Sequence, residues 1–308
     1  MAPNSCSTCS TESSAGDYPL GSPVMPEMFD GSKKIHFRCH KDVGCFNACC
    51  KSIDISLTPY DIVRLKTRLG MDSGEFLREY TVPYEFEKDG LAGVKFKPLE
   101  GSNTCRFMSD AGCDVYEDRP TACRYYPIAL LSMRKQDEYV DRDSYALVKE
   151  PHCLGHNESR EISIDEYRAE QGLPDYDDLA RGWRQLILKK KSSGPAIGKP
   201  SKRSLQLYFM TCYDVDRFRR FVESEAFTQT FEVPADEMKE ILSSDVNLMQ
   251  FGFRLLKQVL FGENTIGLNG ETVEERKKRL HERQLQIERE AAEKMARDEG
   301  EIDEGYDD

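Results

Sequence analysis

The sequence lacks any run that approaches the ~20 consecutive apolar residues needed for a membrane-spanning helix. No early apolar segment resembles a secretory signal peptide either, so we expect a cytoplasmic protein without a membrane partner. An excess of positive charge is also absent, because 55 acidic residues outnumber 43 basic ones and the net charge is −12. An acidic surface repels phosphate backbones, which argues against nucleic acid as a partner. A protein partner is left open.

Several catalytic signatures are missing as well. No Walker loop, HExxH helix, EF-hand loop or Ser-His-Asp arrangement is visible. No glycine-rich strand–turn–helix motif for S-adenosylmethionine is present, and Ser52 stands where a radical-type CxxxCxxC would need its last cysteine. We therefore name no catalytic residue.

Cysteine, in contrast, is abundant, with 11 residues in a chain of 308. Cytosolic thiols are kept reduced, so grouped cysteines there usually hold metal instead of forming disulfides. Cys6 and Cys9 lie in a Ser- and Gly-rich leader and are interpreted as mobile thiols, and Cys212 as a core thiol. We predict that the other eight bind metal: Cys39, Cys45, Cys49, Cys50, Cys105, Cys113, Cys123 and Cys153.

Eight thiolates would fill two four-ligand sites. Adjacent Cys49 and Cys50 diverge in most backbone conformations, so either they serve two metals or one of them packs. Irregular spacing on separate loops favours an Fe–S cluster, expected as [4Fe-4S], and zinc is the alternative. The opposing interpretation is that the thiols are free and behave as small buried hydrophobes.

Positive groups flank the predicted ligands. We expect Arg119 and Arg124 to hydrogen-bond to metal-bound thiolates and offset their charge, with surface salt bridges as the alternative. Any of the four nearby histidines could replace a cysteine as a ligand, but each is more typical of a surface residue or a residue beside the ligands: His36, His40, His152 and His156.

Composition divides the chain into five parts. We predict a disordered segment at 1–34, a cysteine-cluster metal-binding domain at 35–190, a linker at 191–203, a helical module at 204–268, and a charged helix with an acidic tail at 269–308. The expected fold class is α+β, loop-rich and stapled by metal, with short strands and helices. Because long apolar segments are few, we expect the metal-free chain to be largely unfolded between Cys39 and Cys153.

Local signals predict individual elements. Thr58 and Pro59 are typical of a helix start, and Gly70 of its end. Further helices are expected after Ser73, over 119–127, over 164–190 with a break at 172–174, and from Pro234. Asp245 is expected to be the N-cap of another helix. Strands are predicted at 92–97, 104–108 and 113–116, in a pair formed by PIALLSMR and EYVDRDSYALVK, and at Tyr208, where a strand would run into a helix.

Three segments carry a family resemblance: FRCHKDVGCFNACC, ISLTPYDIVRLKTRLG and CRFMSDAGCDVYEDRPTACRYYP. In this order they resemble the YkgJ-type cysteine cluster family, a zinc- or iron-chelating domain whose members are often labelled Fe–S cluster proteins. The first block departs from the usual CxxCxxCC, because its spacings here are five and three. The resemblance implies metal chelation by seven cysteines: Cys39, Cys45, Cys49, Cys50, Cys105, Cys113 and Cys123.

We interpret the chain as a metal-binding protein acting in electron transfer, redox sensing or metal handling. Flagellin lysine N-methylases resemble the same family, so an S-adenosylmethionine-dependent protein lysine N-methylase is one alternative. An adaptor with a purely structural zinc site is another.

Overall fold

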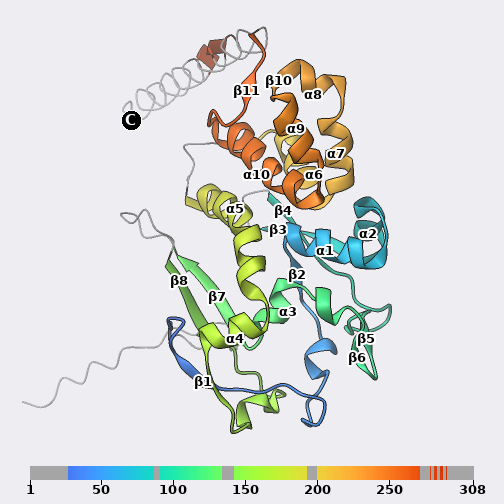
Figure 1. The fold of residues 1–308 in the computed structure, drawn as a ribbon, viewed down its shortest axis with the longest axis vertical. Helices are drawn as coiled ribbons and strands as arrows, with labels where there is room; N and C mark the ends of the chain where they lie inside the picture. The colour runs from blue at the N-terminus through green and yellow to red at the C-terminus, as the bar shows by residue number, and fades with distance from the viewer. Residues whose placement is uncertain are drawn as a thin grey trace, which may run out of the picture. The chain divides into compact units, whose positions relative to one another are not determined.

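The computed structural model describes residues 27–86, 91–133, 142–192 and 200–270, with six positions between 278 and 289 (Figure 1). Its helices and small antiparallel sheets confirm the α+β fold class. The chain divides into two compact units, each made of two stretches: unit 1 is 1–48 with 125–168, and unit 2 is 49–124 with 169–308. Most of the predicted disordered segment, including Cys6 and Cys9, and nearly all of the predicted charged helix lie outside the described residues.

Unit 1 is built from two small antiparallel sheets. Strand β1 (Lys34–His36) pairs with β9 (Glu161–Ser163), and β7 (Ile128–Met133) pairs with β8 (Arg142–Leu147), which confirms the predicted pair. A short 3₁₀ helix, η4 (Leu154–Asn157), follows Cys153. Phe37 packs edge-on against Tyr167 and at a tilt against His156. Aromatic rings therefore contribute to the apolar interior of this unit, together with aliphatic residues such as Ile35 and Ile162.

The first half of unit 2 combines a sheet with two helices. The sheet has the order β2 (Ser56–Leu57), β4 (Leu91–Phe96), β3 (Thr81–Phe86). Helix α1 (Pro59–Leu69) begins with a capping box between Thr58 and Asp61 and ends at Gly70, whose φ of 66° suits glycine. Helix α2 (Ser73–Tyr80) follows at once. Both predicted helices are confirmed, because their start and stop signals act within a single turn.

The cysteine-bearing loops contain only short elements. Strands β5 (Met108–Ser109) and β6 (Gly112–Cys113) form a small hairpin, and the 3₁₀ helix η3 (Tyr116–Asp118) follows. Three elements span the unit boundaries: η1 (Ala48–Cys50), α3 (Thr121–Tyr125) and α4 (Ile164–Glu170). The strands predicted at 104–108 and 113–116 are thus much shorter than expected. Loop contacts replace them, since the Cys105 N–H donates to the Cys50 carbonyl at 2.8 Å and Asp114 N–H to Phe107.

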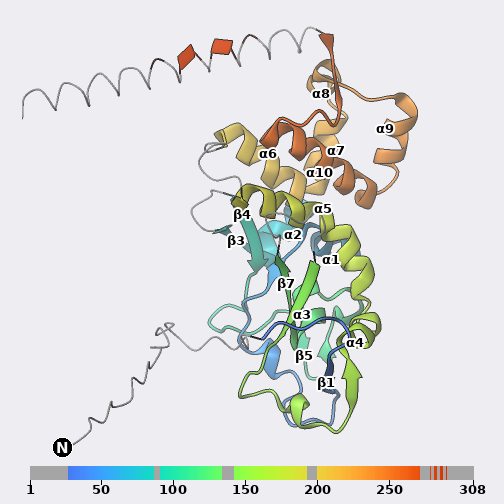
Figure 2. The same ribbon diagram turned by 90° about the vertical axis from the view of Figure 1, so that its left-hand side faces the viewer.

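The rest of unit 2 is helical. Its elements are α5 (Leu173–Ser192), α6 (Lys202–Tyr213), α7 (Val215–Val222), α8 (Glu225–Thr230), α9 (Ala235–Leu242) and α10 (Asp245–Phe261), with β10 (Phe231–Glu232) paired to β11 (Gly267–Leu268). Helix α10 packs against α5, α6, α7 and α9 (Figures 1 and 2). No helix in the described part of the chain is both long and apolar enough to cross a membrane.

Two predictions for this half need correction. The strand expected from Tyr208 is wrong, because this segment lies inside α6. Its aromatic residues favour strands, but burial of Tyr208, Cys212 and Tyr213 against the other helices outweighs that preference. The cap of α10 is Ser244, whose hydroxyl accepts the Asn247 N–H, and Asp245 is the first helical residue.

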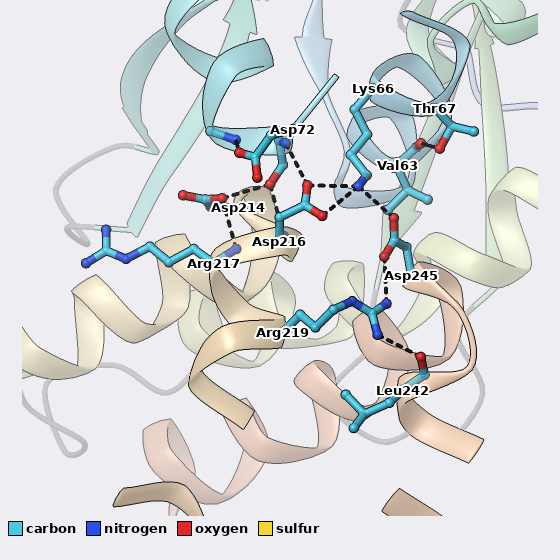
Figure 3. A network of polar contacts seen from close by, with 12 residues as sticks. Val63, Lys66, Thr67, Asp72, Asp214, Asp216, Arg217, Arg219, Leu242 and Asp245 are labelled. Carbon is cyan, nitrogen blue, oxygen red and sulfur yellow. Dashed lines mark hydrogen bonds and ion pairs between the residues drawn. The ribbon is translucent and has the colours of Figure 1, made fainter. Parts of the chain in front are cut away.

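An ion network joins four helices within unit 2 (Figure 3). The Lys66 Nζ on α1 lies 2.8 and 2.9 Å from the two carboxylate oxygens of Asp216 on α7, and 2.8 Å from Asp245 on α10. The Ser73 N–H at the start of α2 donates to Asp216, and Arg219 donates to Asp245. Burial alone would lower the pKa of Lys66, but its hydrogen bonds to both carboxylates outweigh burial and raise it. The charged form of Lys66 is therefore stabilised by Asp216 and Asp245.

Candidate metal centre

Five of the predicted ligands belong to unit 2. Cys49 and Cys50 lie in η1, Cys105 precedes β5, Cys113 lies on β6 and Cys123 lies in α3. We call these five residues the unit 2 thiol cluster. Three segments of chain therefore contribute sulfur to one compact unit, and the hydrogen bond from Cys105 to Cys50 ties two of those segments together.

The electrostatics show that these thiols are neighbours. A hydrogen bond to Cys49, whose sulfur lies 4.0 Å away, raises the pKa of Cys50, and burial and the charges of Cys105 and Cys123 raise it further. Burial raises the pKa of Cys123, and the charges of Cys105, Cys113 and Cys49 add to that effect. Each negative thiolate thus disfavours the next one. Together they form a set that a cation would stabilise.

The thiols are near each other without forming a closed site. Among the described residues, no group of three or more His, Cys, Asp or Glu side chains has the arrangement that could hold a metal ion. The donor chemistry of the unit 2 thiol cluster nevertheless fits a thiophilic metal, because several soft sulfur ligands share one neighbourhood. Metal binding would need these side chains to move together.

Asp61 positions the helix that carries Cys123. Its buried carboxylate accepts the Thr121 N–H and the Thr121 hydroxyl, each at 2.8 Å, and also the Thr58 N–H. Burial raises the pKa of Asp61, whereas these hydrogen bonds oppose that change. One side chain thus caps α1 and also the start of α3. No local sequence pattern shows this second role of Asp61, because its partner Thr121 lies 60 positions away.

Replacing Asp61 with Asn is expected to lower both stability and metal affinity. The substitution replaces one of the two accepting carboxylate oxygens with an NH2 group, which can only donate. A buried N–H donor is then left without an acceptor, at a cost of about 1–3 kcal/mol. Loss of the α3 anchor should weaken metal affinity by about 10–100-fold, the usual effect of disturbing a group that orients a ligand. Chelator competition and thermal unfolding measure the two effects.

Asp110→Asn is the matched control, since Asp110 is exposed in the β5–β6 turn of the same region. It should leave affinity and stability unchanged. Equal behaviour of the two variants would show that Asp61 does not position the ligand.

The two predicted arginines have different surroundings. Burial raises the pKa of Cys113, and the charge of Arg119 opposes that change. The Arg124 guanidinium donates to the backbone carbonyls of Arg119, Gln171 and Glu117 and stacks over the Tyr176 ring at 4.2 Å. Arg124 thus fastens the loops on both sides of α3. Its role as a partner of metal-bound thiolates stays a prediction.

The remaining three predicted ligands belong to unit 1. The Cys45 sulfur accepts the Leu154 N–H at 3.1 Å, and the Cys45 and Cys153 thiols lie within hydrogen-bonding reach of each other. Cys39 is exposed, and it follows Arg38, whose N–H donates to the Gly155 carbonyl. The structure therefore assigns the eight predicted ligands to two different units.

The other candidates have ordinary structural surroundings. His36, His40 and His152 lie near carboxylates, 4.0 Å from Glu161, 3.4 Å from Glu158 and 3.4 Å from Glu150 respectively. The ring of His156 hydrogen-bonds to the Val148 carbonyl at 3.0 Å. Cys212 is buried in the core of unit 2, as expected.

A family model matches the segment that carries all eight predicted ligands. Residues 38–153 match CxxCxxCC, described as "Putative zinc- or iron-chelating domain". The resemblance to the cysteine cluster family is confirmed. The CxxCxxCC match supports binding of zinc or iron in general and does not choose between them. No curated protein and no solved structure was found to match the chain.

Within the matched segment, two short stretches have identifiable physical roles. The portion 57–61 supplies Thr58 and Asp61, and the portion 119–124 supplies Thr121 and Arg124. Asp61 joins the two portions by its hydrogen bonds to Thr121. These polar residues therefore organise the backbone around Cys123.

Proposed function

We propose that the unit 2 thiol cluster binds an iron–sulfur cluster, expected as [4Fe-4S], and that this centre serves in electron transfer or redox sensing. The observation that supports the proposal is the convergence of five thiols from three segments in one compact unit. Four ligands satisfy such a cluster, so one thiol is in excess. The adjacent pair offers the simplest choice, with either Cys49 or Cys50 serving as ligand alongside Cys105, Cys113 and Cys123.

The surroundings of the thiols fit this use. Cys105 is buried, and Phe107, two residues after it, packs against Tyr80 and Phe96. Arg119 places positive charge near Cys113, which would offset the negative charge of bound thiolates. A bound Fe–S cluster supplies one-electron chemistry, with a potential that depends on burial, net charge and hydrogen bonds to sulfur.

Metal identity is tested by producing the full chain anaerobically with both iron and zinc available. We expect iron with acid-labile sulfide by elemental analysis, and a visible absorption that fades on reduction. A colourless protein with stoichiometric zinc would overturn the iron–sulfur proposal. That result would support a structural zinc site in the same thiol cluster.

A further inference from the structure

Unit 1 contains a second thiol group that the proposed function does not use. Cys45 and Cys153 are 108 positions apart in sequence, yet the Leu154 N–H donates to the Cys45 sulfur at 3.1 Å. Leu154 directly follows Cys153, so this bond places the Cys45 sulfur against the backbone of Cys153. The two thiols also lie within hydrogen-bonding reach of each other. Both are half-buried, which leaves part of each accessible to a small reagent.

Hydrogen-bond donors lie beside both sulfurs. The Leu154 N–H donates to the Cys45 sulfur. Burial raises the pKa of Cys153 overall, and the nearby Tyr126 hydroxyl and Gly155 N–H oppose that change. Donors beside sulfur favour the thiolate, which is the nucleophile in disulfide exchange, and here they oppose the effect of burial. Both cysteines also lie at the ends of ordered local structure. The Ala48 N–H donates to the Cys45 carbonyl, and Cys153 precedes η4.

We propose that Cys45 and Cys153 form a reversible dithiol–disulfide pair that reacts with low-molecular-weight disulfides such as oxidised glutathione. The Cys45 thiolate attacks one sulfur of the disulfide RSSR, which gives the mixed disulfide Cys45–S–SR and releases RS⁻. The Cys153 thiolate then attacks the Cys45 sulfur and releases the second RS⁻. The two thiol protons end on two RSH molecules, so two electrons pass from the protein to the small disulfide.

The bond would join the two stretches of unit 1 covalently. Without it, contacts between those stretches include the three-residue pairing of β1 with β9, the Phe29–Tyr145 bridge and the bond from Arg38 to Gly155. A cross-link between distant positions restricts the unfolded chain strongly. Oxidation is therefore expected to make unit 1 more resistant to proteolysis.

The test uses the full chain with its metal bound, treated with excess oxidised glutathione and then with an alkylating reagent. Non-reducing tryptic digestion should yield peptide 42–51 linked to peptide 150–160. Fragment ions must place the link on Cys45, because Cys49 and Cys50 lie in the same peptide. The linked peptide should become the main form of both segments and disappear on reduction. Cys39→Ser is the matched control and should keep the link.

Cys153→Ser supplies the second test, since Cys45 should then stop at the mixed disulfide with glutathione. Three outcomes would overturn the proposal: both thiols stay free, Cys153 links to Cys39 instead, or the link forms only after a chelator has removed metal. The last outcome would make the pair metal ligands. Metal content and visible absorption, recorded on the same samples, test the unit 2 proposal separately.

Discussion

Cys123→Ala is expected to release the metal and to free the thiol-bearing loops of unit 2. A metal held by thiolates contributes about 10–16 kcal/mol of apparent binding free energy. The whole of a domain's stability is only about 5–15 kcal/mol. We therefore expect amides at 49–53 and 104–123 to lose about 5 kcal/mol of protection in hydrogen exchange. Amides of α6 and α10 should keep theirs, because local opening depends on local contacts.

Cys212→Ala is the matched control for this experiment. It removes a thiol from the same unit, but Cys212 lies within α6 and is buried in the apolar core. It should lower overall stability modestly and leave metal content unchanged. Full metal content in Cys123→Ala, with unchanged exchange at 104–123, would show that the unit 2 thiol cluster is not the metal site.

The structure indicates that less of the metal-free chain unfolds than the whole segment from Cys39 to Cys153. Residues between these limits also belong to the apolar core of unit 2, including Leu57, Leu65, Phe76 and Val94. Their burial does not depend on sulfur. We expect a chelated, reduced sample to keep most of its helical circular dichroism, with the loss confined to the cysteine loops.

Lys66→Met is expected to lower the free energy of unfolding by about 3 kcal/mol. The Lys66 side chain is only 10% exposed, and those of Asp216 and Asp245 are 22% and 21% exposed. Removing the cation leaves Asp216 without its charged partner, and an uncompensated, partly buried charge is costly. Asp245 keeps its bond to Arg219. Denaturant titration measures the change, and adding Asp216→Asn should recover part of it.

The pH dependence of this deficit follows from the shifted pKa values. Burial alone would raise the pKa of Asp216, but its bonds to Lys66 and Ser73 hold it below 3.8. That stabilisation is present above 3.8 and is lost as pH falls through the lowered value. The pKa of Lys66 lies above 10.5, so its contribution is present below 10.5 and lost as pH rises through the raised value. The deficit of Lys66→Met should be constant around neutral pH and should shrink as pH approaches either limit, because Asp216 without Lys66 takes up a proton more readily.

Lys95→Met is the control for Lys66→Met. Lys95 pairs with Asp54 at 2.8 Å, but their side chains are 38% and 79% exposed. An exposed pair contributes less than about 1 kcal/mol. A deficit in Lys66→Met as small as that of Lys95→Met would contradict the view that burial makes the network costly to break.

Sequence reasoning succeeded where the deciding interaction is short in range. Thr58 and Asp61 form a capping box three residues apart, and Gly70 ends α1 with a left-handed residue. The pairing of β7 with β8 was visible for the same reason, since both strands flank one connection. The strand predicted from Tyr208 is wrong, because packing of α6 against other helices, and not local preference, decides the structure of this segment.

By itself, the sequence determined that this chain carries a thiol-rich segment suited to zinc or iron, because the number and chemical type of the sulfur donors follow directly from the cysteine residues. Only the tertiary structure decided which thiols are neighbours. It groups Cys50 with Cys105 and Cys123 in unit 2, and Cys45 with Cys153 in unit 1. These groupings depend on bonds such as Cys105 to Cys50 and Thr121 to Asp61, which span more than 50 positions. No local pattern encodes such distances, because contacts far apart in sequence form only when the whole unit packs.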